Sequence, residues 1–163
     1  MRILAGVMIV IVLLVGAFFG YAYYGAQMQI EAVYAQVTPA TEALGTYNET
    51  LSQIYNGSFY GTQYREVEFA GAEEYAFLTL TVRMQNRGPF PMEYIQIAVT
   101  PGTLDIVQLP TDRTPSLAAR SKADFSTVVL TQAGASSNRQ VTVTYYVLGQ
   151  KQTATYAMTA EGQ

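Results

Sequence analysis

The feature that most constrains the fold is a two-residue hydrophobic periodicity that begins after Phe59 and continues through the rest of the chain. In YAFLTLTVRMQN (75–86), every even position from 76 to 84 is apolar, which is typical of a half-buried strand. Six further strands are predicted at 64–69, 92–99, 103–109, 124–131, 140–148 and 152–158. Seven short strands separated by turn residues predict a mainly β fold, a seven-stranded antiparallel Ig-like sandwich over residues 59–163.

The predicted connections fit this architecture. Gly149-Gln150 is expected to form a two-residue hairpin, and Pro101-Gly102 suits a turn. The polar stretch 110–122 is expected to cross from one sheet to the other.

The N-terminus has the opposite character. Residues 3–24 carry no charge and, at ~1.5 Å per residue, would extend ~33 Å as a helix, close to the ~30 Å core of a bilayer. Tyr21, Tyr23 and Tyr24 cluster at one end, where an aromatic belt would meet the lipid headgroups. Residues 1–24 are therefore predicted to form a transmembrane helix, with the lipid bilayer as a partner.

Charge predicts the orientation of this helix. Arg2 and the amino terminus lie before the apolar run, whereas Glu31, Glu42 and Glu49 follow it. The positive-inside rule then predicts a single-pass protein with a cytoplasmic N-terminus and an extracytoplasmic C-terminal domain.

Two alternatives compete with the membrane span. The first is a cleaved signal peptide with a small-x-small site at Gly20-Tyr21-Ala22. The second is a type IV pilin-like chain, which also places an apolar helix ahead of a β domain. The apolar run is longer than the usual signal h-region, and no prepilin cleavage motif is evident.

Residues 25–58 are predicted to form a juxtamembrane helical stalk, because their apolar residues have heptad spacing. The seam consists of Ile30, Val33, Val37, Ala40, Leu44, Tyr47, Leu51 and Ile54. Pro39 is expected to break the stalk near 37–39 and to start a second helix, capped by Thr38. That helix should end near Tyr55, with Gly57 in the left-handed position that follows.

The second helix carries a candidate partner-packing face of Leu44, Tyr47, Leu51 and Ile54. One hypothesis is that this face contacts a protein partner or a second copy of the chain. The alternative is that it packs on the protein's own β domain.

The composition excludes several kinds of site. The chain has neither cysteine nor histidine, which removes disulfides, Cys/His metal centres and the commonest general base. Its nine basic residues form no run, so nucleic acid is not an expected partner. No residue pattern points to a catalytic site, a cofactor or a small-molecule substrate, and a Ser-Lys hydrolase has no recognisable motif around Lys122 or Lys151.

Two weaker candidates concern modification and metal binding. Asn48 and Asn56 both lie in N-x-[ST] tripeptides and are possible glycosylation sites on an exported chain. Calcium is a minor alternative for the acidic residues, although no loop resembles an EF-hand. The acidic residues considered are Glu66, Glu68, Glu73, Glu74, Asp105 and Asp112.

The stretch QNRGPFPMEYIQIAV (85–99) carries a resemblance to known domains. A predicted strand ends in Asn86, Gly88-Pro89-Phe90-Pro91 follows, and a second strand begins. This resembles the late-embryogenesis-abundant LEA14/WHy type of β sandwich and is similar to the Ig-like modules of archaeal and bacterial surface proteins. Arg87 stands where that family has a proline. The resemblance implies a sandwich over roughly residues 60–160, often anchored to a membrane, and no catalytic site.

The sequence therefore predicts a non-catalytic, membrane-anchored extracytoplasmic interaction module or an accessory subunit of a membrane complex. The alternative is a structural subunit of a surface filament or layer, with the apolar helices forming its core.

Overall fold

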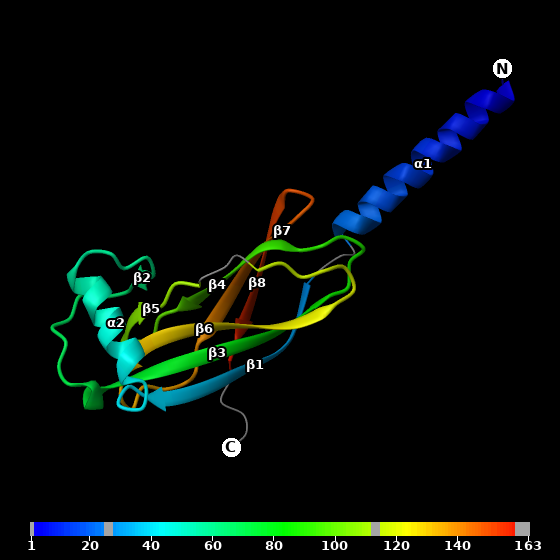
Figure 1. Ribbon diagram of the computed structural model, residues 1–163. Coiled ribbons are helices and arrows are strands. Elements are labelled where there is room, and N and C mark those ends of the chain that lie inside the picture. The colour runs from blue at the N-terminus through cyan, green and yellow to red at the C-terminus, as the bar shows by residue number, and fades with distance from the viewer. Residues whose placement is uncertain (1, 25–27, 112–114, 159–163) are drawn as a thin grey trace.

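The chain forms two packed β sheets and an N-terminal helix that projects from one end of them (Figure 1). This computed structural model describes residues 2–24, 28–111 and 115–158, and within the N-terminal helix it describes the side chains of Ile3 and residues 6–21. The helices are α1 (Arg2–Tyr24), α2 (Leu44–Tyr55) and the short 3-10 helix η1 (Ala72–Glu74). The strands are β1 (Met28–Pro39), β2 (Thr62–Gln63), β3 (Tyr75–Asn86), β4 (Glu93–Thr100), β5 (Asp105–Gln108), β6 (Lys122–Gln132), β7 (Gln140–Val147) and β8 (Gln150–Ala157).

The two sheets confirm the prediction of a mainly β, antiparallel sandwich. One sheet has five strands in the order β1-β3-β6-β5-β2, and the other has three in the order β4-β7-β8. Apolar side chains from both sheets form the main core, among them Leu80, Val82, Met92 and Val143. The described residues contain eight strands, whereas the sequence predicted seven.

Strand β1, which together with the short β2 was not predicted, corrects the prediction of a helical stalk. Residues 28–39 pair with β3 along its whole length, with a register shift between Ile30 and Ala32. This bulge at Glu31 places Ile30 and Val33 on the same face, although a regular strand would place residues three apart on opposite faces. The bulge thus produced the three-residue spacing that resembled a heptad.

The start of the second helix was also predicted wrongly. Pro39 ends β1, Ala43 is the N-cap, and α2 begins at Leu44. The predicted end is confirmed, because α2 stops at Tyr55 and Gly57 adopts a φ of +66°.

Two further predictions in the strand region need correction. Residues 64–69 form no strand, and their alternation arises because Val67 and Phe69 cover the outer face of the five-stranded sheet. The connection after β5 does not change sheets, because β5 and β6 are neighbours in the five-stranded sheet. Leu117 nevertheless forms an isolated bridge with Met92, so this connection touches the opposite sheet before it returns.

The hairpin before β8 lies one residue earlier than predicted. Val147 pairs with Gln150, which leaves Leu148 and Gly149 as the two-residue loop. Both have positive φ, +50° and +76°, as a type I′ turn requires.

A second apolar cluster lies on the outside of the five-stranded sheet, beneath α2. Tyr47 of α2 is buried there against Tyr75, Phe77 and Leu130. The Tyr47 and Tyr75 rings stack with centroids 5.6 Å apart. The sandwich therefore has a third layer at the end distant from α1 (Figure 1).

The predicted N-terminal helix is confirmed as a helix, α1. Its prediction as a membrane span receives no support from the described residues, in which no helix is long and apolar enough to cross a membrane. The ring of Phe18 meets that of Phe90 edge-on, with centroids 6.2 Å apart.

Asn86 organises the loop that follows β3. Its side chain is fully buried, and its Nδ2 donates to the carbonyl oxygens of Phe90 and Ala118 at 2.8 and 3.0 Å. Its Oδ1 accepts a hydrogen bond from the Gly88 N–H at 2.9 Å. One carboxamide thus ties the loop after β3 to the connection that precedes β6.

Replacing Asn86 with alanine should lower the free energy of unfolding by about 1–3 kcal/mol, because buried carbonyl groups lose their donor. Urea unfolding of the full chain in mild detergent would measure this change. Asn138→Ala, at an exposed loop position, is the matched control and should change it by less than about 0.5 kcal/mol. Equal effects would show that the Asn86 hydrogen bonds do not stabilise the loop.

Candidate functional site

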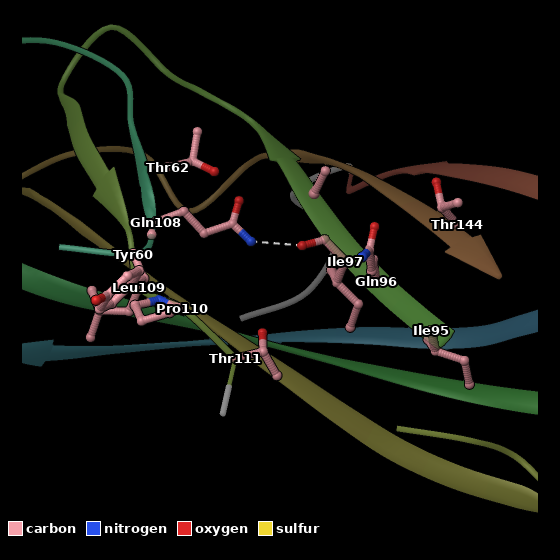
Figure 2. A pocket seen from close by; sticks show the side chains of 12 residues that line it. Tyr60, Thr62, Ile95, Gln96, Ile97, Gln108, Leu109, Pro110, Thr111 and Thr144 are labelled. Carbon is pink, nitrogen blue, oxygen red and sulfur yellow. Dashed lines mark hydrogen bonds between the residues drawn. The ribbon is translucent and has the colours of Figure 1, made fainter. Parts of the chain in front are cut away.

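One hollow among the described residues lies beside β4, an edge strand of the three-stranded sheet. It has a volume of about 310 Å³. Ile95, Gln96, Ile97 and Ala98 of β4 form one wall (Figure 2). The opposite wall comes from the β2 and β5 side of the other sheet and consists of Tyr60, Gly61, Thr62, Gln108, Leu109, Pro110 and Thr111. We call this hollow the β4 groove.

Gln108 joins the two walls of the β4 groove. From β5, its Nε2 donates to the Ile97 carbonyl oxygen at 2.6 Å, the contact drawn in Figure 2. Its Oε1 accepts a hydrogen bond from the Val99 N–H at 3.2 Å. The carboxamide therefore occupies the place that a peptide unit of a neighbouring strand would take along the β4 edge.

The Gln108 carboxamide is held in place by two hydroxyl groups, from the buried Thr127 and the partly buried Tyr64. Its Nε2 also donates to Thr127 Oγ1 at 2.8 Å. The Tyr64 hydroxyl lies 2.8 Å from Gln108 Oε1 and 3.0 Å from the Val99 carbonyl oxygen. Since Gln108 itself is buried, this arrangement is part of the folded framework.

The other end of the β4 edge is also occupied. Ile95 N–H donates to the Pro115 carbonyl oxygen at 3.0 Å, and Met92 and Leu117 exchange two backbone hydrogen bonds. Between these contacts and Gln108 the edge borders the groove.

The described lining of the β4 groove is mostly apolar, threonine and glutamine side chains. Among these described lining residues, Tyr60 is the one with an ionisable side chain. The described residues also contain no group of three or more metal-ligating side chains.

The predicted partner-packing face of α2 lies elsewhere and is largely covered. Tyr47 is 3% exposed, and Leu51 and Ile54 pack against the second apolar cluster. Leu44 is half exposed and contributes little to this packing. The structure thus supports the alternative that the face packs on the protein's own domain.

The other predicted site residues are scattered. Tyr21 lies exposed on α1, and the side chains of Tyr23 and Tyr24 lie outside the described residues. Asn48 is exposed on α2, and Asn56 is the exposed C-cap residue of the same helix. Glycosylation of either asparagine stays a prediction.

Among the described residues, the acidic residues considered for calcium form no group of three or more possible metal ligands. Asp105 instead forms a buried ion pair with Arg139, whose Nη2 and Nε each lie 2.6 Å from a carboxylate oxygen. Burial alone would raise the pKa of Asp105, but hydrogen bonds from Arg139 and Gly102 and the Arg139 charge hold it below its ordinary value. Asp112 lies outside the described residues.

Sequence reasoning missed Gln108 and the groove. One signal was present: Gln108 is a polar residue at the end of DIVQ, a segment whose other residues are also buried. That signal marks a buried amide that needs partners, but it does not say that those partners lie on the edge of another sheet.

Two tyrosines, the buried Tyr47 and the partly buried Tyr64, predict a loss of stability at alkaline pH. Burial raises the pKa of both Tyr47 and Tyr64 from 10.0 to about 12. Between these values the folded state retains protons that the unfolded state has lost, so the free energy of unfolding should fall as pH rises from 10 to 12. In Tyr47→Phe/Tyr64→Phe this fall should be smaller, and denaturant titrations across that range would measure the difference. An unchanged pH dependence would contradict the assignment.

No family model and no curated protein matches the sequence. Among solved structures, the GAE domain of GGA2p from Saccharomyces cerevisiae has a TM-score of 0.39 at 10% identity, over 63% of this chain and 98% of that one. The yeast GGA1 GAE domain has a TM-score of 0.37 at 12% identity, over 61% of this chain and 88% of that one. At these scores the similarity establishes neither a family nor a function.

Proposed function

We propose that this protein is a non-catalytic interaction module, anchored to a membrane by α1 and presenting its sandwich outside the cytoplasm. The observation that carries the proposal is the uncovered apolar surface of α1. From Val7 to Phe19 its large apolar side chains are 48–66% exposed. A helix that is apolar on all sides needs a cover, and lipid supplies one.

Features of the sandwich support the proposal that it acts as an interaction module. It closes its own core between the sheets and a second cluster beneath α2, so it has no need of α1 for its packing. The described lining of the β4 groove offers apolar, threonine and glutamine side chains, which suit the binding of a partner. The orientation follows from Arg2 before the apolar run and the acidic residues after it.

Protease accessibility tests this arrangement. In intact cells that express the full chain, added protease should degrade the sandwich while a cytoplasmic marker protein survives. Protection of the sandwich in intact cells, with degradation after permeabilisation, would contradict the extracytoplasmic location.

A filament is the second candidate, because the same exposed surface of α1 would also pack against copies of itself. Solubilisation of the native protein in detergent separates the two. A discrete particle on size-exclusion chromatography supports the anchored module, whereas fibres that sediment support the filament.

A further inference from the structure

We infer that the end of the sandwich from which α1 projects rests on the bilayer surface and binds anionic lipid headgroups. We call this surface the α1-proximal end, and it consists of exposed or partly exposed residues in the loops and at the strand ends there: Arg87, Phe90, Tyr94, Arg120, Lys122, Tyr146, Leu148 and Lys151. The proposed anchoring by α1 underlies this inference, which adds that the sandwich itself touches lipid in a fixed orientation.

Strand register brings these residues to one end of the sandwich. The end of β3 pairs with the start of β1 on one side and with the start of β6 on the other. The start of β4 pairs with the end of β7, and the hairpin from β7 to β8 carries Leu148. At the start of β1 the Met28 N–H donates to the Tyr145 hydroxyl at 3.3 Å, which joins the two sheets here. Figure 1 shows these strand ends on the side from which α1 projects.

The contact between Phe18 and Phe90 sets the depth of this end. Phe90 lies in the loop after β3, and its ring meets that of Phe18 edge-on. Because α1 ends at Tyr24, Phe18 lies ~9 Å along the helix from that end at 1.5 Å per residue. With α1 in a bilayer, the loop after β3 therefore reaches the level of the headgroups.

Backbone strain is concentrated at the α1-proximal end. Among the described residues, the non-glycine residues with positive φ are Tyr94, Arg120 and Leu148, at +51°, +54° and +50°. All three are exposed, Tyr94 by 59% and Leu148 by 57%. Leu148 is the clearest case, because its position in a type I′ turn favours asparagine or glycine. Strained residues of this kind gather at functional sites, which points to a function for this end.

Charge is distributed unevenly between the two ends of the sandwich. Besides the acidic Glu31 and Glu93, the described residues of the α1-proximal end include four exposed basic ones: Arg87, Arg120, Lys122 and Lys151. Besides the partly buried Arg65, the described residues around α2 and η1 at the other end include six exposed acidic ones: Glu42, Glu49, Glu66, Glu68, Glu73 and Glu74. A negatively charged lipid surface would therefore attract the first end and repel the second.

Aromatic and apolar side chains lie among these basic groups. The rings of Tyr94 and Tyr146 meet edge-on with centroids 6.1 Å apart, and Lys151 pairs with Tyr146 across the β7–β8 ladder. Tyrosine and lysine combine an apolar body with a polar tip, which suits the level of the headgroups. Leu148, at the tip of the hairpin, supplies an apolar group that would enter the bilayer surface. This combination fits the headgroup region of an anionic bilayer.

Site-specific fluorescence tests the contact, because the chain has no cysteine of its own. The full chain with Gln150→Cys, an exposed position in the same hairpin, is labelled with an environment-sensitive fluorophore. It is then reconstituted in nanodiscs of phosphatidylcholine and phosphatidylglycerol. Lipids with a nitroxide on the headgroup should quench this label strongly. A label at Asn138→Cys, exposed before the opposite end of β7, should be quenched weakly. Equal quenching at the two positions would overturn the inference.

Two double variants test the recognition of lipid charge, with the label kept at Gln150→Cys. Arg120→Gln/Lys151→Gln should lower the ratio of docked to undocked chains roughly tenfold, because two basic groups near an anionic surface are lost. Asn48→Asp/Asn138→Asp is the matched control, since it changes the net charge equally at the opposite end and should have little effect. Equal effects of the two double variants, or equal quenching in phosphatidylcholine alone, would overturn the recognition of anionic headgroups.

Leu148→Asn separates the lipid contact from the stability of the hairpin. Asparagine suits this turn position, so urea unfolding in detergent should show no loss of stability. In nanodiscs, quenching of the label at Gln150→Cys should nevertheless fall. A destabilised variant would give Leu148 a structural role, and unchanged quenching would exclude it from the lipid contact. Either result contradicts the role inferred for Leu148.

Failure of this inference is distinguishable from failure of the proposed function. A chain that does not co-purify with nanodiscs would contradict the anchoring by α1 and the lipid contact together. A chain that co-purifies, but whose label at Gln150→Cys is not quenched, would contradict the lipid contact alone and would leave a protein partner as the occupant of the α1-proximal end.

Discussion

Replacing Arg139 with methionine should lower the free energy of unfolding by about 3–5 kcal/mol, because the substitution leaves a buried carboxylate without its partner. The side chains of Arg139 and Asp105 are 5% and 0% exposed. Arg139 also donates from Nη1 to the carbonyl oxygens of Ser136 and Asn138, each at 2.7 Å. This one side chain therefore joins the loop before β7 to the start of β5, and urea unfolding of the full chain would measure its contribution.

A second ion pair supplies the control. Arg83 and Asp124 lie 2.8 Å apart, but both side chains are more than 40% exposed. Arg83→Met should therefore lower the free energy of unfolding far less than Arg139→Met, because water solvates the remaining carboxylate. The double variant Arg139→Met/Asp105→Asn should be more stable than Arg139→Met alone, since no buried charge is left unpaired. Similar losses for Arg83→Met and Arg139→Met would contradict the role assigned to burial.

Replacing Tyr47 with alanine should lower the free energy of unfolding by about 3–5 kcal/mol, the range observed when a large buried ring is removed from a core. Tyr47 packs on Tyr75 in the second apolar cluster, and its hydroxyl donates to the Ala70 carbonyl oxygen at 2.9 Å. The loss should appear in the unfolding of the monomer, because the side chain contacts the protein's own sheet.

Leu44→Ala is the matched control on the same helix. Leu44 is 50% exposed, so its truncation should cost less than about 1 kcal/mol. A contrary result would be a Tyr47→Ala chain that retains its stability and loses self-association, which would make α2 an intermolecular contact.

The sequence predicted most of the fold where local periodicity and final topology agree. The predicted strand at 75–86 coincides with β3, and the strands at 124–131 and 140–148 lie close to β6 and β7. The predicted end of α2 was found as well, because a glycine with positive φ is a local signal.

Local periodicity failed at β1 because a bulge changed its phase. Because Glu31 is an extra residue in the strand, Ile30 and Val33 both face the core although they are three residues apart. This three-residue spacing is also typical of a helix. Pro39 was consistent with either reading, since proline occurs at the first turn of a helix and also at the end of an edge strand. Pairing with β3, a contact distant in sequence, decides between them.

The β4 groove could not be predicted from the sequence, because it also depends on contacts between residues distant in the chain. The β4 groove forms because sheet order places β5 beside the edge strand β4. No local pattern in residues 93–100 or 105–108 encodes that neighbour. In the sequence Asn86 stood out only as the end of a predicted strand, whereas its buried side chain proves to hydrogen-bond to the loop that follows β3.

The central proposal is that α1 holds the sandwich at a membrane, and washing isolated membranes with alkaline carbonate tests this proposal most directly. The full chain should stay in the membrane pellet, whereas a variant with Val10→Glu and Leu13→Arg, two exposed apolar positions of α1, should move to the supernatant. Recovery of the unaltered chain in the supernatant would contradict the account.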